Sequence, residues 1–227
     1  MAGSSGEGMV WYAAYGSNMC AARMACYIVG GRPVGGARVY PGCRDRRLPE
    51  RAVGVVLPGQ LYFAGESTVW TGGMGFYDPF DPGWMPARAY LLTVGQFADV
   101  AAQEMHRAPG PAAAAAGAGE RAEPEPGLDL RAVLADGRAA LGPGRYETLV
   151  CAGTLERRPV LTFTAPGRSA GAGLGRPSAG YLRQLAAGLW EAHGWGPARA
   201  AAYLAARPGA CGGWTVAEIT RALSEQP

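Results

Sequence analysis

The stretch Val10-Trp11-Tyr12-Ala13-Ala14-Tyr15-Gly16-Ser17-Asn18-Met19 decides the fold of this chain. It begins as an apolar run with aromatic residues, which is typical of a buried strand, and it breaks at Gly16. The following run, 20–29, consists mainly of helix-forming residues and ends at Gly30-Gly31. The sequence therefore predicts a buried strand, a tight glycine turn and a helix.

The turn at 16–18 is the first candidate for a binding function. Ser17 or Asn18 would serve as N-cap of the helix, whose first backbone N–H groups have no partner within the helix. Such a corner can hold a carboxylate or a developing oxyanion. Short glycine turns are common, however, and the local pattern by itself favours an ordinary strand-to-helix connection.

The composition excludes several classes of function. The chain has 227 residues and a formal net charge of +3, so it fits one decorated domain and indicates neither nucleic acid nor membrane as partner. No apolar run is long enough to span a bilayer. Five cysteines without metal-type spacing, and a start without a signal-peptide pattern, predict a cytoplasmic protein.

The sequence contains few residues that could serve as metal ligands. The chain contains two histidines, His106 and His193. Zinc hydrolases of the three-ligand type and metal-dependent deacetylases would need more. We therefore expect no metal and no cofactor.

The pattern of short strands with inserted and appended helices predicts an α+β fold. Turn signals separate predicted strands at 10–15, 52–57, 59–64, 68–77, 87–93, 146–152 and 159–165, with Gly153-Thr154 near the last turn. Predicted helices lie at 20–29, 93–107, 129–136 and 178–193, and two more begin at Pro197 and Thr215. The Pro/Ala/Gly-rich segment 109–127 predicts an irregular loop.

We expect a flexible tail at 1–8 and a single main domain at 9–194. Inserts interrupt this domain at about 31–60 and 107–145. A helical extension at 195–227 is expected to pack on the same domain. The oligomeric state does not follow from the sequence.

Glu104 is the strongest candidate for a catalytic residue. On the predicted helix opened by Thr93, it continues the apolar stripe of Phe97, Val100 and Ala101 at the i, i+3, i+4, i+7 spacing. An unpaired carboxylate on a core-facing stripe is costly, and its desolvation would raise the pKa of Glu104. A second interpretation places Glu104 at the edge of the stripe, paired with Arg107.

His106 is rejected as a direct partner of Glu104. Two residues of helix separate the positions by about 160° on a helical wheel. No serine or cysteine has an obvious base close to it in sequence, so the residues do not support a covalent nucleophile.

The pentad Tyr15-Gly16-Ser17-Asn18-Met19 resembles the signature of the γ-glutamylcyclotransferase-like (AIG2/butirosin-deprotection-type) family. The runs 88–93 and 97–104 resemble the strand and helix that carry the catalytic glutamate of that family, although Met105 stands where the family has glycine. Trp70-Thr71-Gly72-Gly73 resembles its cavity-lining strand, and Pro177-Ser178-Ala179-Gly180-Tyr181 its loop-to-helix motif.

This resemblance implies a small mixed β-barrel with inserted and C-terminal helices, and a metal-independent enzyme that acts on a γ-glutamyl amide. Glu104 would be the general acid and base that releases 5-oxoproline and a free amine. The implied substrate-binding residues are Tyr12, Tyr15, Gly16, Ser17, Asn18, Met19, Trp70, Gly72, Gly73 and Tyr181.

Other interpretations of the same residues stay open. The glycine pair at 72–73 is equally typical of a β-bulge, and Tyr12, Tyr15 and Tyr181 are equally suited to packing. The same pocket would also suit an amidase or acyltransferase acting on a natural-product amide, or a non-catalytic module that binds a small molecule or a protein.

Overall fold

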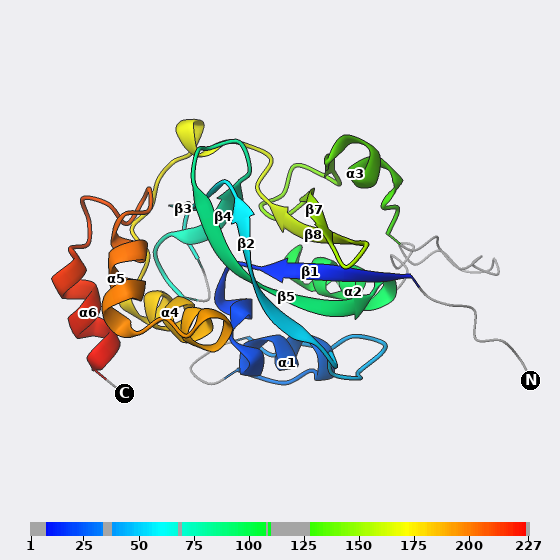
Figure 1. The fold of residues 1–227 in the computed structure, drawn as a ribbon, viewed down its shortest axis with the longest axis horizontal. Helices are drawn as coiled ribbons and strands as arrows, with labels where there is room; N and C mark the ends of the chain where they lie inside the picture. Colours follow the sequence, from blue (N-terminus) through cyan, green and yellow to red (C-terminus); the bar gives the residue numbers. More distant parts are fainter. Residues whose placement is uncertain (1–7, 34–37, 68–69, 108, 110–127, 226–227) are drawn as a thin grey trace, which may run out of the picture.

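The structure, a computed structural model, describes residues 8–33, 38–67, 70–107, 109 and 128–225 (Figure 1). The predicted tail at 1–8 and the predicted irregular loop at 109–127 lie almost entirely outside the described residues. The remainder is an α+β fold, as the sequence predicts.

The strands are β1 (Met9–Ala14), β2 (Ala52–Pro58), β3 (Gln60–Ala64), β4 (Met74–Asp78), β5 (Trp84–Thr93), β6 (Arg138–Ala140), β7 (Thr148–Leu155) and β8 (Arg158–Thr164). The helices are α1 (Ala21–Val29), α2 (Val94–Glu104), α3 (Arg131–Asp136), α4 (Ala179–His193), α5 (Pro197–Ala205) and α6 (Val216–Ser224). Two short 3-10 turns occupy Ser17–Met19 and Ser169–Gly171.

The first strand lies at the centre of a six-stranded mixed sheet with the order β2-β5-β1-β8-β7-β6. β1 pairs antiparallel with β5 and parallel with β8, so Trp11 stands opposite Leu91 on one side and Val160 on the other. Trp11 has no exposed surface. The apolar run that opens the chain is therefore a central strand, because both of its neighbours and both of its faces are covered.

The described strands do not close into the expected barrel. β2 and β6 are the two edges of the large sheet, and β3 and β4 form a separate two-stranded sheet. β4 meets the end of β8 through a side chain, because the Tyr77 N–H donates to Thr164 Oγ1 at 3.0 Å and that hydroxyl donates to the Tyr77 carbonyl at 2.7 Å.

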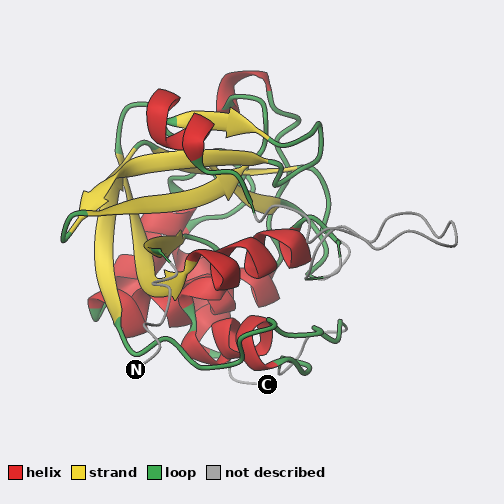
Figure 2. Cartoon of the chain, turned by 90° about the vertical axis from the view of Figure 1, so that its right-hand side faces the viewer, coloured by secondary structure: helices red, strands yellow, loops and turns green. Residues whose placement is uncertain are grey.

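Three helices begin at the residues that the capping patterns predict. Thr93 and Gln96 form a capping box at α2, Ser178 caps α4, and Thr215 with Glu218 caps α6. Figure 2 shows the helices packed against the sheet, and α4, α5 and α6 gather at one end of the molecule in Figure 1. No described helix combines the length and apolarity needed to cross a bilayer.

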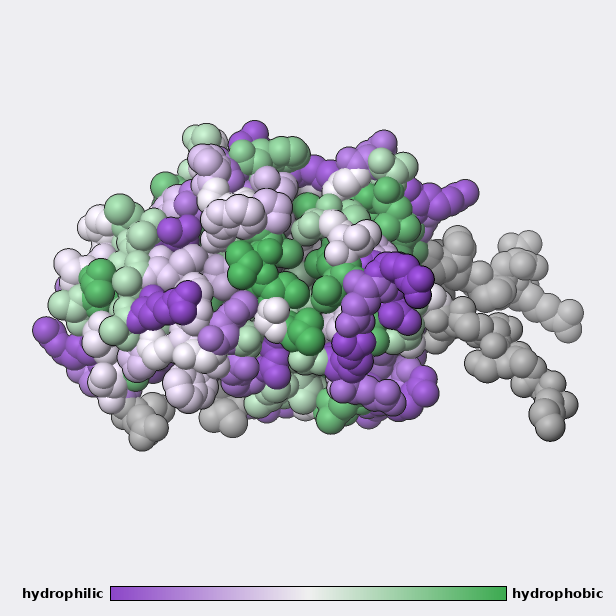
Figure 3. Space-filling model, viewed as in Figure 1, coloured by the Kyte–Doolittle hydropathy of each residue, from purple (hydrophilic) through white to green (hydrophobic). Residues whose placement is uncertain are grey.

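Hydrophobic residues also appear on the surface. Figure 3 shows them gathered near the middle of the face on which β2 lies, with hydrophilic residues around them. β2 is an edge strand, and Val56 on it is 54% exposed. Exposed residues alternate with more buried ones along β2, so the face that carries Val56 is in contact with solvent.

One local prediction was wrong, and a second was only approximate. Neither Ser17 nor Asn18 caps α1, because Ser17–Met19 forms its own 3-10 turn and Cys20 precedes the helix without a side-chain cap. The turn between β7 and β8 is made by Glu156 and Arg157, both at positive φ, whereas the positive-φ Gly153 lies at a register shift in the ladder. The glycine therefore marks a bulge.

The glycine pair of the Trp70-Thr71-Gly72-Gly73 motif permits close packing of two backbone segments. A Cβ at Gly73 would lie 2.0 Å from the carbonyl oxygen of Gly175, and one at Gly72 2.3 Å from that of Arg176. The Gly73 N–H also donates to the Arg176 carbonyl at 2.8 Å. The chain before α4 therefore approaches these two glycines closely.

We expect Gly73→Ala to lower the free energy of unfolding by about 1–3 kcal/mol, since one of the two backbone segments must move to admit the methyl group. Chemical denaturation of the purified variant measures this difference. Gly167→Ala is the matched control, because a Cβ at Gly167 meets no atom within 4 Å. Equal stability of the two variants would contradict the packing argument.

Candidate functional site

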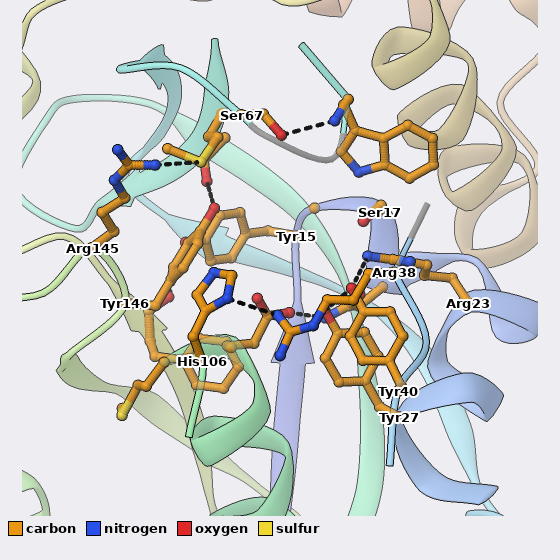
Figure 4. Close-up of a pocket in the computed structure, with 18 of the residues that line it drawn as sticks. Tyr15, Ser17, Arg23, Tyr27, Arg38, Tyr40, Ser67, His106, Arg145 and Tyr146 are labelled. Atoms are coloured by element: carbon orange, nitrogen blue, oxygen red, sulfur yellow. Dashed lines mark hydrogen bonds between the residues drawn. The ribbon is translucent and has the colours of Figure 1, made fainter. Parts of the chain in front are cut away.

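A cavity of about 300 Å³ opens where the first turn of the chain meets the end of α2 (Figure 4). Its walls come from β1 and the turn after it, from α1, from the last residue of α2, from the loop before β7, and from the first turn of α4. Segments that are far apart in sequence thus share one site.

The structure brings most of the predicted site residues together in this cavity. Those that line it are Tyr12, Tyr15, Gly16, Ser17, Asn18, Trp70, Glu104 and Tyr181. The predicted convergence of the glycine turn, Glu104 and Tyr181 on one pocket is therefore present in the structure.

Three predicted substrate-binding residues are not among those that line the cavity. Gly72 and Gly73 contact the chain before α4, as described above. Met19 is buried, with its backbone carbonyl accepting hydrogen bonds from the hydroxyl of Tyr90 at 2.9 Å and from Arg88 at 3.1 Å. Met19 holds the turn against β5.

Glu104 is partly buried at the last position of α2 and faces the cavity. Its Oε1 accepts a hydrogen bond from Asn18 Nδ2 at 2.7 Å. The alternative partner from the sequence, Arg107, instead forms an ion pair with Glu147. Glu104 is therefore held by the glycine turn and not by its helical neighbour.

Asn18 connects the turn to the carboxylate and keeps further hydrogen-bonding capacity. Its Nδ2 also donates to the hydroxyl of Tyr12 at 3.2 Å, while its Oδ1 is buried without a partner among the described residues. The backbone N–H groups of Ser17 and Asn18 likewise have no acceptor in the described chain. The turn that holds Glu104 through Asn18 thus contains polar groups without partners among the described residues.

Tyr181 enters the cavity from the first turn of α4, where Ser178 caps the helix. Its hydroxyl accepts a hydrogen bond from the Gly75 N–H at 3.2 Å, and its ring stacks on Trp70. Burial, together with the negative charge of Glu104, raises the pKa of Tyr181 to about 12. The phenol therefore keeps its proton at neutral pH and can donate it in a hydrogen bond.

We expect Tyr181→Phe to lower the free energy of unfolding by about 1–3 kcal/mol, because the buried Gly75 N–H loses its acceptor. Affinity for a ligand that accepts a hydrogen bond from the phenol should fall as well. Thermal unfolding and equilibrium titration measure the two effects.

Tyr203→Phe is the matched control for this substitution. The Tyr203 hydroxyl is buried and has no partner among the described residues, so its removal should cost little or nothing. If both variants lost the same stability, the hydrogen bond of Tyr181 would not be the cause.

Several tyrosines surround Glu104. Burial raises the pKa of Tyr12, Tyr27 and Tyr146 well above the usual value, and the charge of Glu104 contributes to each shift. These phenols therefore stay neutral at physiological pH. The carboxylate faces neutral hydrogen-bonding groups, which do not repel it.

The sequence analysis missed a group of residues in the cavity wall. They are mainly cationic or aromatic: Arg23, Tyr27, Arg38, Tyr40, His106, Arg145 and Tyr146. Arg23 stands in an otherwise apolar helical run. A charged residue in such a run is the signal that identified Glu104, and the same signal could have identified Arg23.

The described residues contain no group of three or more His, Cys, Asp or Glu placed to hold a metal ion. The five cysteines are free thiols. Burial raises the pKa of the Cys43 thiol to about 12, so this group stays protonated and is no nucleophile at neutral pH.

Comparison with known proteins gives a partial match. No protein-family model matches the chain. Over 166 residues, 68% of the chain, the sequence is 33% identical to histone deacetylase 5 from Arabidopsis thaliana. The chain spans only 23% of the length of that protein, whose name describes a much longer molecule.

Two solved structures are similar over nearly their whole length. One is an uncharacterized protein from Homo sapiens, with a TM-score of 0.48 and 15% identity, covering 96% of this chain and 100% of the other. The second is a gamma-glutamyl cyclotransferase, with a TM-score of 0.48 and 14% identity, covering 95% of this chain and 98% of the other. The second of these structures carries the name of the family that the sequence motifs resemble.

Proposed function

We propose that this chain is a γ-glutamylcyclotransferase-like enzyme that cleaves a γ-glutamyl amide into 5-oxoproline and a free amine. The observation that carries the proposal is the hydrogen bond of 2.7 Å from Asn18 to Glu104 within the cavity. It joins two of the four motifs that carry the family resemblance. It also orients a carboxylate toward a turn with unused donors and an unused acceptor.

In the proposed reaction, Glu104 takes a proton from the α-ammonium group of the substrate. Asn18, which donates to Glu104 at 2.7 Å, holds the carboxylate in place for this transfer. Glu104 then acts as a general base of the kind that contributes about 10²–10⁴-fold to a rate.

The freed amine attacks the δ-carbonyl carbon of its own molecule, and a five-membered ring forms. Backbone N–H groups of Ser17 and Asn18 would stabilise the glutamyl carboxylate or the oxyanion that develops. Glu104 returns the proton to the departing amine as the C–N bond breaks. The attack is intramolecular, so the protein needs to supply no nucleophile.

Tyr181 would donate its phenolic proton to the bound substrate. Its pKa of about 12 keeps this donor available throughout the neutral range, and the donor is lost only as the pH rises through that value. Burial against Trp70 holds the ring in place. Tyr181 thus supports binding and takes no part in proton transfer.

Mass spectrometry after incubation with a panel of γ-glutamyl amides tests the proposal. Release of 5-oxoproline with the matching amine is the expected result. Free glutamate as the product would assign hydrolysis, and a γ-glutamyl group transferred to an added amine would assign acyl transfer. Binding without any turnover across the panel would assign a non-catalytic module.

A further inference from the structure

The 3-10 turn Ser17–Met19 is held in place by residues that do not line the cavity. Two of them, Arg88 and Tyr90, lie on β5, and the other two, Gly188 and Glu191, lie on α4. We call these four residues the clamp. In Figure 1 the turn after β1 lies next to α4, as the contact at Gly188 described below requires.

Tyr90 forms the β5 half of the clamp together with Arg88. Tyr90 is 3% exposed, and its hydroxyl donates to the backbone carbonyls of Asn18 and Met19 at 3.0 and 2.9 Å. Arg88 Nη1 donates to the Met19 carbonyl as well, at 3.1 Å. Burial raises the pKa of Tyr90, so its hydroxyl keeps its proton at neutral pH and remains a donor.

The α4 half of the clamp contacts the turn directly and also caps the helix after it. A Cβ at Gly188 would lie 2.4 Å from Met19 Cβ, so only glycine allows this approach. Glu191 accepts a hydrogen bond from the Ala21 N–H at 2.8 Å, at the start of a helix that has no side-chain cap of its own. Glu191 also pairs with Arg88, which joins the two halves.

The clamp decides which backbone groups of the turn stay free. The carbonyls of Gly16 and Ser17 accept from the N–H groups three residues later, at 3.0 and 3.2 Å. The clamp takes the carbonyls of Asn18 and Met19. Every carbonyl from 16 to 19 therefore has a partner, whereas the N–H groups of Ser17 and Asn18 have none in the described chain.

The same contacts fix the turn relative to the other groups of the site. The residue whose carbonyl Tyr90 holds is Asn18, and the side chain of Asn18 donates to Glu104 at 2.7 Å. The helix that contacts the turn through Gly188 is the one that carries Tyr181 into the cavity from its first turn. A shift of the turn against β5 or α4 would thus change both arrangements.

We propose that the clamp positions the turn for the reaction, and that Tyr90 is the positioning residue through which Asn18 is held against Glu104. The inference rests on the proposed function, because it assigns Tyr90 a role in that reaction. Tyr90 does not touch the substrate in this scheme. A displacement of about 1 Å in a reacting group can cost about 10²-fold in rate, so a contact outside the cavity can act strongly on kcat.

Tyr90→Phe tests the β5 half, because it removes the hydroxyl and keeps the ring. We expect kcat for the best γ-glutamyl amide to fall about 10- to 100-fold. Tyr77→Phe is the matched control: Tyr77 is 1% exposed, its hydroxyl donates to the Pro58 carbonyl, and it does not line the cavity. Both variants lose one buried hydrogen bond, so their stabilities should fall alike, but kcat of Tyr77→Phe should be unchanged.

Rates are compared at a temperature at which thermal unfolding shows every variant to be fully folded. Equal kcat values for Tyr90→Phe and Tyr77→Phe would overturn the inference, since a purely structural role affects both variants alike. A change in KM with kcat unaltered would also overturn it, because the proposed action is on the proton transfer by Glu104.

Gly188→Ala tests the α4 half, because the added methyl group must push the turn and α4 apart. We expect kcat to fall at least about 10-fold. Gly180→Ala makes the same change on the same helix, and its Cβ would meet Ser178 Oγ at 3.9 Å, an ordinary contact distance. Its kcat should be unchanged, and equal rates in the two variants would overturn the role of α4. If Gly188→Ala does not fold, the tyrosine pair decides.

Hydrogen exchange of the Met19 amide, followed by NMR, tests the clamp without substrate. This N–H donates to the Gly16 carbonyl inside the turn at 3.0 Å. We expect it to exchange about 10-fold faster in Tyr90→Phe than in Tyr77→Phe, because local opening of the turn costs less. Equal exchange in the two variants would overturn the clamp. Failure of the proposed function is seen separately, as absence of 5-oxoproline in reactions of the unmodified protein.

Discussion

Replacement of Glu104 by glutamine is expected to lower the rate of 5-oxoproline formation by about 10²–10⁴-fold, the contribution of a general base. Glutamine has the same shape, and its side-chain oxygen can still accept the hydrogen bond that Asn18 donates at 2.7 Å. The substitution thus removes proton transfer while the wall of the cavity is preserved. Initial rates with the best γ-glutamyl amide of the panel measure the effect.

Glu50→Gln is the control, because it makes the same chemical change at an exposed residue that does not line the cavity. Its rate should match that of the unmodified protein. The thermal unfolding midpoint of Glu104→Gln should also stay close to the original. A folded Glu104→Gln protein with an undiminished rate would remove Glu104 from the reaction.

Phe97→Ala is expected to lower the free energy of unfolding by about 3–5 kcal/mol, the usual cost of emptying a large buried aromatic site. Phe97 has no exposed surface, and its ring centre lies 5.9 Å from that of Tyr12 and 6.1 Å from that of Phe163. It holds α2 against the large sheet. Because Glu104 ends the same helix, activity should fall as well. Chemical denaturation measures the loss of stability.

Phe80→Ala is the matched control for size and chemistry. Phe80 is 59% exposed, and its main interaction is with the Arg168 guanidinium at 4.9 Å from the ring centre. Such an exposed contact contributes about 0.5–1 kcal/mol. Similar losses in Phe97→Ala and Phe80→Ala would contradict the claim that burial of Phe97 anchors the helix.

The starts of α2, α4 and α6 could be predicted from the sequence. The capping boxes at Thr93 and Thr215 and the cap at Ser178 are local interactions over three residues, so they can be identified without knowledge of the fold. The same local logic failed at α1. There the residues with capping side chains form a 3-10 turn whose Asn18 side chain bonds to α2.

A charge in an apolar helical run was an informative signal, and it was used only once. It identified Glu104, which lines the cavity, but it applies equally to Arg23 in the run 20–29. His106 was rejected only as a direct partner of Glu104, and in the described chain it bonds to Arg38 instead. It nevertheless lines the cavity, because α2 ends at Glu104 and His106, at a φ of 59°, lies outside the helix.

The sequence by itself determined the buried first strand, the turn after it, and the three motifs that supply Asn18, Glu104 and Tyr181. Only the tertiary structure decided that the barrel stays open, that the glycine pair serves packing, and that Arg23 enters the cavity with two unused donors. Helix caps and hydrophobic periodicity depend on residues that are close in sequence. Residues that meet in the sheet, in the glycine packing and in the cavity are far apart in sequence, as Asn18 and Glu104 are at a separation of 86 residues.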